Sequence, residues 1–292
     1  MARRIDLNGS IVLITGAGAG IGRALCEEAL RRGAHVVAIE RDADVLETLE
    51  GTHLTKHCAD VCDGARMQEI VAQTLADHGR LDVAIANAGI EKIEPIWAQN
   101  PKAFEAVINV NMLGVYRTLQ PCLAPIIASG GHLCAMSSIA GIIPFPFGVA
   151  YSTSKAAVDM MMRVMRLELL ATEATAGAAY FGFIASEMGE RVTGHPGVAA
   201  LSKWMPRPLL GLTPYLTPAV AAQRVLNDIE KRKARSYTPG VIRLTYALRG
   251  LYAQSDDFLG RYVMGLPSFI KTHYGLPGSE KSDGTSSTKS TK

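Results

Sequence analysis

The chain lacks the features that mark membrane, secreted and nucleic-acid-binding proteins. No hydrophobic run approaches the roughly 20 residues of a membrane-spanning helix, and the first apolar run, residues 11–14, is too short for a signal peptide. The formal net charge is only +3, and the Lys and Arg residues are spread along the chain rather than clustered. We therefore expect a cytoplasmic protein that has no nucleic-acid partner.

Cysteine is also scarce, and its pattern does not suggest disulfides. The five cysteines are scattered along the chain: Cys26, Cys58, Cys62, Cys122 and Cys134. We predict buried thiols in a reducing compartment. His53 and His57 lie near two of them, and these residue types do form zinc sites. However, His57 and Cys58 are neighbours in a predicted strand and would point to opposite faces, so we predict no metal site.

Apolar residues are plentiful and occur in short runs at regular intervals along the sequence. The chain is 48% hydrophobic and 20% charged, which allows a sizeable core. Short apolar runs predict strands at 10–15, 34–39, 53–61, 81–87, 131–138 and 176–184, and the stretches between them predict helices at 64–78, 102–128 and 151–170. Strands that alternate with helices predict an α/β fold with a doubly wound parallel sheet of the Rossmann type.

A glycine-rich turn follows the first predicted strand and precedes a helix that runs to about residue 32. The turn contains Gly16, Gly18, Ala19, Gly20, Ile21 and Gly22. A strand, a glycine turn and a helix together offer free backbone N–H groups and the positive end of a helix dipole to a pyrophosphate. We predict that this turn binds a dinucleotide.

The second predicted strand ends at Glu40 and Arg41, where dinucleotide-binding folds recognise the adenosine ribose. An acidic residue there can bond the ribose hydroxyls, whereas an Arg can bind a 2′-phosphate. Glu40 would repel a phosphate, and Ala19 adds no positive charge. We therefore predict NAD as the cofactor, with NADP as the alternative.

Tyr151 and Lys155 lie four residues apart, on one face of a predicted helix. A tyrosine with its ordinary pKa of about 10 is a poor acid or base at neutral pH. A neighbouring ammonium stabilises the phenolate, so we predict that Lys155 lowers the pKa of Tyr151. The alternative is that Tyr-Ser-Thr-Ser-Lys is simply the beginning of an ordinary helix.

These motifs occur in a familiar order. Thr-Gly-Ala-Gly-Ala-Gly-Ile-Gly at 15–22 is followed by Asp60-Val61, Asn87-Ala88-Gly89, Asn111, Ser138, Tyr151 and Lys155. With them, residues 6–245 resemble the short-chain dehydrogenase/reductase family, in the subgroup with a Tyr-x-x-x-Lys motif. The resemblance implies an enzyme that transfers a hydride between a nicotinamide cofactor and a substrate carbon.

The resemblance also implies catalytic roles. Tyr151 would exchange a proton with the substrate oxygen, Lys155 would lower its pKa and bind the nicotinamide ribose, and Ser138 would polarise the substrate oxygen. Asn111 would hold a helix irregularity and a water molecule that relays protons.

Two neighbouring residues, Asn109 and Ser137, do not have the family spacing, and we expect them to serve turns or packing.

Cofactor contacts follow from the resemblance in the same way. Asp60 and Val61 would contact the adenine ring. Asn87, Ala88 and Gly89 would steady the central sheet and support the ribose. After the sixth strand, Phe181 replaces the usual proline, and Ser186 stands where the family has Thr. Ile184 and Ser186 would then bind the nicotinamide carboxamide.

The sequence also predicts a substrate site and a division of the chain into three regions. We expect a catalytic domain at 1–245 with an apolar substrate lid at about 187–215, a C-terminal extension at 246–278 and a disordered tail at 279–292. Ile142, Ile143, Pro144, Phe145 and Phe147 would form another apolar wall. An apolar lid and wall predict a hydrophobic substrate such as a steroid, a terpenoid or an aromatic alcohol; packing of the lid on the core is the alternative.

We therefore expect an NAD(P)-dependent oxidoreductase that interconverts a secondary alcohol and a ketone. A homodimer or homotetramer is expected, because the family associates through the helices near Asn111 and after Tyr151. Two alternatives are a non-catalytic dinucleotide-binding sensor or scaffold and a lipid reductase associated with a membrane surface. The extension leaves three roles open: a lid, a subunit contact or membrane attachment.

Overall fold

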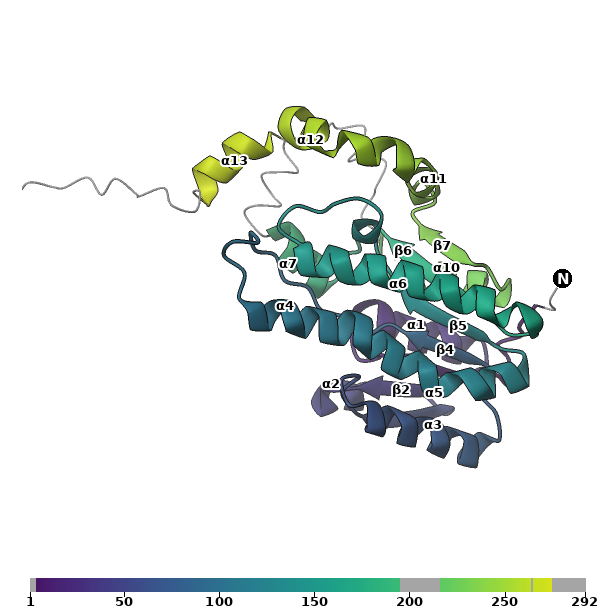
Figure 1. Ribbon diagram of the computed structural model, residues 1–292. Coiled ribbons are helices and arrows are strands. Elements are labelled where there is room, and N and C mark those ends of the chain that lie inside the picture. Colours follow the sequence, from purple (N-terminus) through teal and green to yellow (C-terminus); the bar gives the residue numbers. More distant parts are fainter. Residues whose placement is uncertain (1–3, 195–215, 264, 275–292) are drawn as a thin grey trace, which may run out of the picture.

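A single parallel sheet forms the centre of the molecule. The structure, a computed structural model, describes residues 4–194, 216–263 and 265–274 (Figure 1). Within them, seven parallel strands pair in the order β3-β2-β1-β4-β5-β6-β7. The strands are β1 (Ile11–Thr15), β2 (His35–Glu40), β3 (Leu54–Cys58), β4 (Val83–Ala86), β5 (His132–Met136), β6 (Thr175–Phe181) and β7 (Arg235–Thr238). The predicted doubly wound α/β fold is confirmed.

Helices cover both faces of this sheet (Figure 1). They are α1 (Gly20–Arg31), α2 (Ala43–Glu47), α3 (Gly64–His78), α4 (Pro101–Ile108), α5 (Gly114–Ser129), α6 (Val149–Glu168), α7 (Glu187–Gly194), α10 (Pro218–Glu230), α11 (Ile242–Tyr252), α12 (Asp256–Phe258) and α13 (Leu266–His273). Short 3₁₀ segments are η2 (Ile139–Gly141), η3 (Leu169–Ala171) and η4 (Ala253–Ser255), and π-helical segments are η1 (Asn109–Leu113) and η5 (Leu259–Val263).

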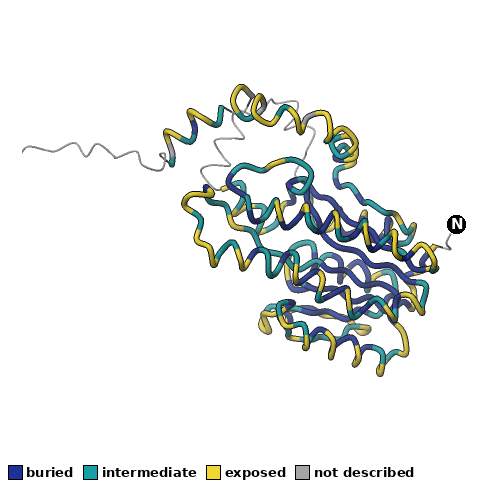
Figure 2. The backbone as a smooth tube through the Cα atoms, viewed as in Figure 1, coloured by how far each residue is buried: buried dark blue, intermediate teal, exposed yellow. Residues whose placement is uncertain are grey.

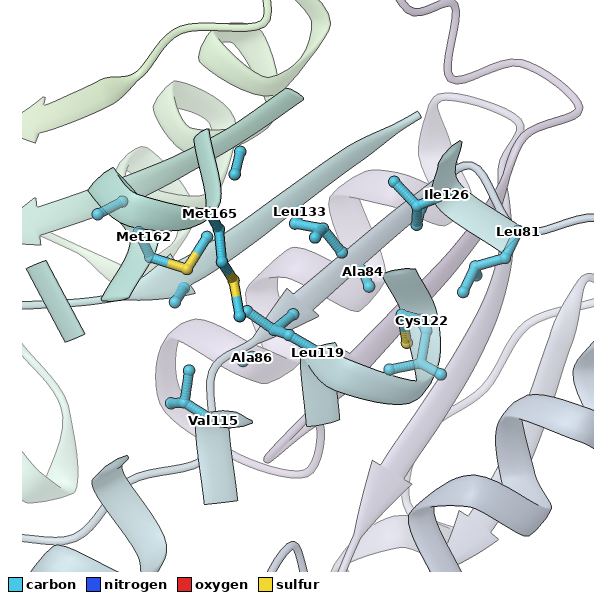
Figure 3. Packing of buried hydrophobic residues seen from close by; sticks show 14 of the residues in the cluster. Leu81, Ala84, Ala86, Val115, Leu119, Cys122, Ile126, Leu133, Met162 and Met165 are labelled. Atoms are coloured by element: carbon cyan, nitrogen blue, oxygen red, sulfur yellow. The ribbon is translucent and has the colours of Figure 1, made fainter. Parts of the chain in front are cut away.

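The strands are apolar along their whole length because both of their faces are buried. In β1, Ile11 and Leu13 face the core beneath α3, α5 and α6, whereas Val12 and Ile14 face the core beneath α1 and α10. Figure 2 shows the strands as the most deeply buried part of the backbone. Figure 3 shows the first of these cores from close by, with Leu119 near Met165. The two cores hold the sheet from both faces, and the carboxyl ends of its strands carry the candidate site.

Some predictions needed correction in detail. The third strand is shorter than residues 53–61, because it pairs with β2 only over Leu54–Cys58. Three cysteines are buried as predicted, but Cys58 is exposed and Cys62 is half-buried, because both lie where β3 leaves the sheet. All five are free thiols. In the described part of the chain, no three His, Cys, Asp or Glu side chains are grouped closely enough to hold a metal.

The C-terminal helices form an arc along the β7 side of the sheet (Figure 1). Residue 245, the predicted end of the catalytic domain, lies inside α11. Tyr246 on this helix donates a hydrogen bond of 3.1 Å to the buried carboxylate of Asp159, which also accepts one from Tyr180. The beginning of the predicted extension is therefore anchored to α6 and β6.

Two further predictions concern segments at the margins of the described residues. Of the predicted lid at 187–215, residues 195–215 lie outside the described residues, as does the whole of the tail at 279–292. None of the helices in the described ranges combines the length and the apolar character needed to cross a bilayer.

A buried histidine makes the fold sensitive to acid. His132, at the beginning of β5, is 1% exposed, and its Nδ1 lies 2.7 Å from the Thr175 hydroxyl. Burial, together with Arg166 and Arg232, lowers the pKa of His132 from 6.5 to about 3. In this range the unfolded chain binds a proton that the folded chain does not, so the free energy of unfolding falls as the pH falls below about 6.5.

We expect His132→Asn to weaken this pH dependence. The variant loses the imidazole but can keep a hydrogen bond to Thr175. Between about pH 6.5 and pH 4 its free energy of unfolding should fall by about 3 kcal/mol less than that of the wild type. Urea denaturation at several pH values measures the difference. The exposed His53→Asn is the control and should follow the wild type; equal slopes in all three proteins would show that His132 does not carry the effect.

Candidate active site

The predicted site residues gather at the carboxyl ends of the parallel strands. Gly16 follows β1, Asn87 follows β4, and Ser138 lies just beyond β5. Strand β1 pairs with β2 on one side and with β4 on the other, so the strand order reverses there. Open α/β sheets bind their ligands at such a point.

The glycine turn is tightly packed and leaves the beginning of α1 uncapped. Gly16 has a positive φ of 64°, which residues with a side chain rarely adopt. A Cβ on Gly22 would lie 1.8 Å from the Gly16 carbonyl oxygen, so α1 rests directly on the turn. Ala19, the N-cap of α1, makes no side-chain capping bond, and the first turn holds no acidic residue. The first N–H groups of α1, which begins with Gly20 and Ile21, therefore suit a pyrophosphate.

Glu40 folds back onto the glycine turn. Its Oε2 accepts a hydrogen bond of 3.2 Å from the Gly18 N–H, and its Oε1 accepts one of 2.9 Å from the Arg41 N–H. The Arg41 residue is exposed. The carboxylate thus lies beside the turn, where it can accept hydrogen bonds from ribose hydroxyls and would repel a phosphate.

Asp60 and Val61 lie beyond the end of β3. The Asp60 side chain accepts a hydrogen bond of 2.8 Å from the Cys62 N–H. Val61 is 6% exposed and packs against Gly114, where an added Cβ would lie 2.7 Å from a Val61 methyl group. The side chain of Val61 is therefore committed to the core, and its backbone is the part that remains to meet a ligand.

Asn87 ties the end of β4 to the glycine turn. Its Nδ2 donates hydrogen bonds of 3.0 Å to the carbonyl oxygens of Thr15 and Gly16. The N–H groups of Asn87 and Ala88 donate to the Thr15 hydroxyl. At Gly89, an added Cβ would lie 3.4 Å from the Lys155 Nζ. This motif therefore connects the glycine turn to the predicted catalytic residues.

Asn111 lies in the π-helical segment between α4 and α5 and is fully buried. Its Oδ1 accepts the Ile90 N–H at 2.8 Å, and its Nδ2 donates to the Ile90 carbonyl at 2.9 Å and to the Ser154 hydroxyl at 3.1 Å. The helix irregularity predicted here is present. In contrast, Asn109 accepts a hydrogen bond from Arg117, which is a packing role.

Ser138 faces Tyr151, and Ser137 does not. The Ser138 hydroxyl accepts the Ala140 N–H at 3.1 Å and makes a side-chain hydrogen bond with Tyr151. The Ser137 hydroxyl instead donates to the Lys155 carbonyl at 3.0 Å. The two adjacent serines thus make different contacts, and only Ser138 bonds the tyrosine.

Lys155 is buried beneath Tyr151, with 4% of the residue exposed. Its Nζ donates a hydrogen bond of 2.9 Å to the Met136 carbonyl and lies 5.6 Å from the centre of the Tyr151 ring. Burial lowers the pKa of Lys155 from 10.5 to about 8. The ammonium is therefore poised to lose its proton at a mildly alkaline pH.

The predicted effect of Lys155 on Tyr151 is not present in this structure. Burial of the phenol raises the pKa of Tyr151, the hydrogen bond from Ser138 lowers it, and the charge of Glu91 raises it. Desolvation is the largest of these causes, because a phenolate loses much of its hydration there. The amine lies on the same helix face as the phenol, but its Nζ is directed to the Met136 carbonyl.

Ser186 lies opposite the glycine turn. A Cβ on Gly20 would lie 3.6 Å from the Ser186 Cβ, and the Ser186 hydroxyl accepts the Gly189 N–H at 3.2 Å. Ile184 is 6% exposed and pairs with Leu216 in an isolated parallel bridge. The segment from β6 to α7 thus returns to the predicted dinucleotide site.

An aromatic cluster forms around Phe147, one of the five predicted wall residues, and includes the C-terminal helix; Ile142, another of the five, packs on the sheet core instead. Phe147 precedes Tyr151 by four residues and has a positive φ of 67°, which is uncommon for a residue with a side chain. Its ring lies 5.8 Å from that of Phe269 and 4.9 Å from that of Tyr274. Ile93 packs on the same cluster. The predicted extension therefore reaches back to the loops around the site.

Two features of this site were not predicted from the sequence. One is α13, whose contact with Phe147 joins residues that are distant in the chain. The other is Glu91, which is close enough to Tyr151 for its charge to raise the phenol pKa. Its place two residues after the Asn-Ala-Gly motif was the signal that could have revealed it.

Comparisons with known proteins agree with this geometry. A family model described as "short chain dehydrogenase" matches residues 10–196. The chain is 31% identical over 204 residues to a 3-oxoacyl-(acyl-carrier-protein) reductase of Thermotoga maritima, covering 68% of this chain and 83% of the relative. It is 30% identical over 173 residues to a cis-2,3-dihydrobiphenyl-2,3-diol dehydrogenase of Paraburkholderia xenovorans, covering 56% of this chain and 62% of the relative.

A solved structure shares the fold. It is a short chain dehydrogenase/reductase from Burkholderia phymatum, crystallised in complex with NAD. The TM-score is 0.74 at 22% identity, and the match covers 86% of this chain and 96% of the other.

The buried ammonium of Lys155 should oppose folding. Its pKa of about 8 instead of 10.5 corresponds to a cost of about 3 kcal/mol for the charged form. We expect Lys155→Met to be more stable than the wild type by about 1 to 2 kcal/mol near neutral pH, because the lost hydrogen bond to Met136 offsets part of the gain. Urea denaturation measures the difference.

The gain should also depend on pH. Above about pH 8 the wild-type lysine can lose its proton in the folded state, so the advantage of the variant should shrink as the pH rises toward 10.5. Lys102→Met, at an exposed position on α4, is the control and should match the wild type. A Lys155→Met protein that is less stable than the wild type at every pH would contradict this account.

Proposed function

The chain belongs to the short-chain dehydrogenase family, and from that premise we propose that it interconverts a secondary alcohol and a ketone, with NAD as the hydride carrier and a hydrophobic molecule as the substrate. The family consists of NAD(P)-dependent oxidoreductases. The main support for the proposal is the cluster of Asn111, Ser138, Tyr151 and Lys155. This cluster lies next to the glycine turn, where the beginning of helix α1 has no side-chain cap.

The chain's own residues fit a dinucleotide. The uncapped beginning of α1 would receive the pyrophosphate, and Glu40 would bond the adenosine ribose. The residues Asp60 and Val61 would meet the adenine ring, and Ser186 with Ile184 would bind the carboxamide. When bound, the nicotinamide ring gives or takes the hydride.

The protein's part in the reaction is to hold the substrate oxygen and to move a proton. Ser138 donates a hydrogen bond to that oxygen, and Tyr151 gives it a proton during reduction or takes one during oxidation. The Lys155 ammonium binds the nicotinamide ribose and favours the phenolate when it turns toward Tyr151. Asn111 holds the loop after β4 in register with α6, and a water beside it relays protons through Lys155.

The apolar wall supports a hydrophobic substrate. Phe147, four residues before Tyr151 in the chain, packs with Ile93 and with α13 from the C-terminal extension, so an apolar cluster borders the segment that carries the proposed acid/base residue. The Paraburkholderia relative is by name a dehydrogenase of a dihydrobiphenyl diol, which is a bulky apolar alcohol. A steroid, a terpenoid or an aromatic alcohol would suit such a surface.

Association with copies of the same chain is part of the proposal. Large apolar side chains are exposed along α5 and α6: Tyr116, Met160, Val164 and Leu167 are 50%, 53%, 44% and 66% exposed. Burial of such a surface between two copies would stabilise a dimer or tetramer. In the same helix, Met162 and Met165 are buried in the core.

Two alternatives remain to be distinguished by activity. A sensor or scaffold would bind NAD without turnover, but such a protein has no need for all four clustered catalytic groups. A lipid reductase at a membrane surface is favoured by the exposed Leu244, Leu248 and Leu251, which lie on one face of α11. The cytoplasmic location stays a prediction.

We expect the wild type to reduce NAD in the presence of at least one bulky apolar secondary alcohol. A panel of steroid, terpenoid and aromatic alcohols, followed by the absorbance of reduced nicotinamide, measures this. Tyr151→Phe should lower kcat/KM by at least about 100-fold, because a positioned acid/base contributes that much. Tyr116→Phe, at a half-exposed tyrosine of α5, should retain full activity. Near-full turnover by Tyr151→Phe would overturn the proposed mechanism.

Glu40 should decide between the two cofactors. We expect kcat/KM with NAD to exceed that with NADP by at least about tenfold, or about 1.4 kcal/mol. Glu40→Gln keeps a hydrogen-bond acceptor for the Gly18 N–H but removes the negative charge, so it should narrow this ratio. Asp42→Asn changes a nearby carboxylate that caps α2 and should leave the ratio alone. A wild type that prefers NADP would reverse the cofactor assignment and leave the proposed roles of Asn111, Ser138, Tyr151 and Lys155 untouched.

A further inference from the structure

The segment between Ser138 and Tyr151 forms a loop whose two ends meet. This Ser–Tyr loop, residues 139–150, leads from the end of β5 into the first turn of α6. Its ends are joined because the side chains of Ser138 and Tyr151 make a hydrogen bond with each other. Its first residues rest on α6, where a Cβ on Gly141 would lie 2.7 Å from the Lys155 carbonyl carbon. The loop thus closes on the two groups that are proposed to meet the substrate oxygen.

The second half of the Ser–Tyr loop is held by segments that are distant in the chain. Phe147 is only 9% exposed, whereas Pro144 is exposed. The positive φ of Phe147 is a conformation that a residue with a side chain keeps only where its surroundings hold it. The Phe147 carbonyl accepts a hydrogen bond of 2.8 Å from the Glu94 N–H, and Ile93 packs on the same aromatic cluster. The packing around Phe147 therefore determines the shape of this half of the loop.

Helix α13 supplies aromatic contacts to Phe147, because its apolar residues lie along one stripe. They have the i, i+3, i+4, i+8 spacing of one helix face, and all belong to the cluster around Phe147: Leu266, Phe269, Ile270 and Tyr274. The rings of Phe269 and Tyr274 lie 5.8 and 4.9 Å from that of Phe147. The residues between them are exposed: Pro267, Ser268, Lys271 and Thr272. Figure 1 shows α13 at the end of the arc that lies farthest from α11. One face of α13 is therefore packed against the Ser–Tyr loop.

We propose that α13 clamps the Ser–Tyr loop, and that Phe269 and Tyr274 act through Phe147 as positioning residues for substrate binding. The inference rests on the proposed function and deepens it, because the loop joins the serine and the tyrosine that hold the substrate oxygen. The clamp keeps the loop in one conformation, so a bulky apolar alcohol meets a preformed surface and less of its binding free energy is spent on ordering the loop. The adenosine half of the dinucleotide site lies on other elements, at the glycine turn and Glu40, and does not depend on the clamp.

Phe269→Ala should loosen the loop, because it removes a ring that packs on Phe147. The KM for a bulky apolar alcohol should rise at least about tenfold, since binding must then also order the loop. The dissociation constant of NAD, measured by isothermal titration calorimetry, should stay at the wild-type value, and kcat should change little. Tyr274→Phe keeps the second ring against Phe147 and should match the wild type. Steady-state kinetics with the alcohol as the varied substrate measure the effect.

Two controls separate this role from a general effect on stability. Phe258→Ala makes the same change at a residue that is 59% exposed on α12 of the same extension, and it should leave both constants at their wild-type values. Phe269→Leu restores an apolar side chain at the clamp and should recover most of the wild-type KM. If Phe269→Ala weakens NAD binding as much as alcohol binding, or leaves the KM for the alcohol unchanged, the proposal is wrong.

Hydrogen exchange of the backbone amides tests the clamp without turnover. In Phe269→Ala, the peptide that contains residues 142–148 should exchange faster than in the wild type, whereas peptides from β1 and β4 should exchange at the wild-type rate. Equal exchange of the loop peptide in both proteins, or faster exchange throughout the sheet, would overturn the inference. A wild type that oxidises no alcohol, together with a loop peptide that responds as expected, would refute the proposed function and leave the clamp standing.

Discussion

The site depends on one buried amide. Asn111 bonds both backbone groups of Ile90 and the hydroxyl of Ser154, and so it joins the loop after β4 to α6. Ser154 lies between Tyr151 and Lys155 in the chain, which means that a single side chain sets the helix against the loop. Asn111 lies in the π-helical turn at 109–113, where the chain departs from regular α-helical geometry. Such turns are often found at functional sites.

Around this amide, the protein retains groups that do not favour its own folding. The ammonium of Lys155 is buried with one carbonyl as its hydrogen-bond acceptor, and the phenol of Tyr151 is held where burial raises its pKa. Burial of the Lys155 ammonium weakens the fold, and burial of the Tyr151 phenol suppresses its ionisation. Both groups can respond to a ligand that changes their surroundings. Such conflicts between stability and local chemistry are concentrated in functional sites.

The sequence was sufficient for the fold, because its strands and helices follow from local patterns. The bounds of α3 agree with the amphipathic stretch from Gly64 to His78. The glycine turn was assigned from the pattern of strand, turn and helix, and Asn111 and Ser138 from the resemblance to the family; the structure brings them to the end of the sheet where the strands finish. What spacing could not reveal were contacts between distant segments, such as Glu91 with Arg191 and Phe147 with Phe269. The direction of the Tyr151 pKa shift was also missed, because desolvation depends on burial that a motif does not record.

The packing of α13 on Phe147 has a consequence for the order of assembly. All seven strands precede Pro239 in the chain, so the sheet can form while the last helices are still being synthesised. The aromatic cluster cannot, because Phe269 and Tyr274 leave the ribosome long after Phe147. The newly made protein therefore possesses Tyr151, the proposed acid/base residue, before it possesses the complete aromatic cluster around Phe147.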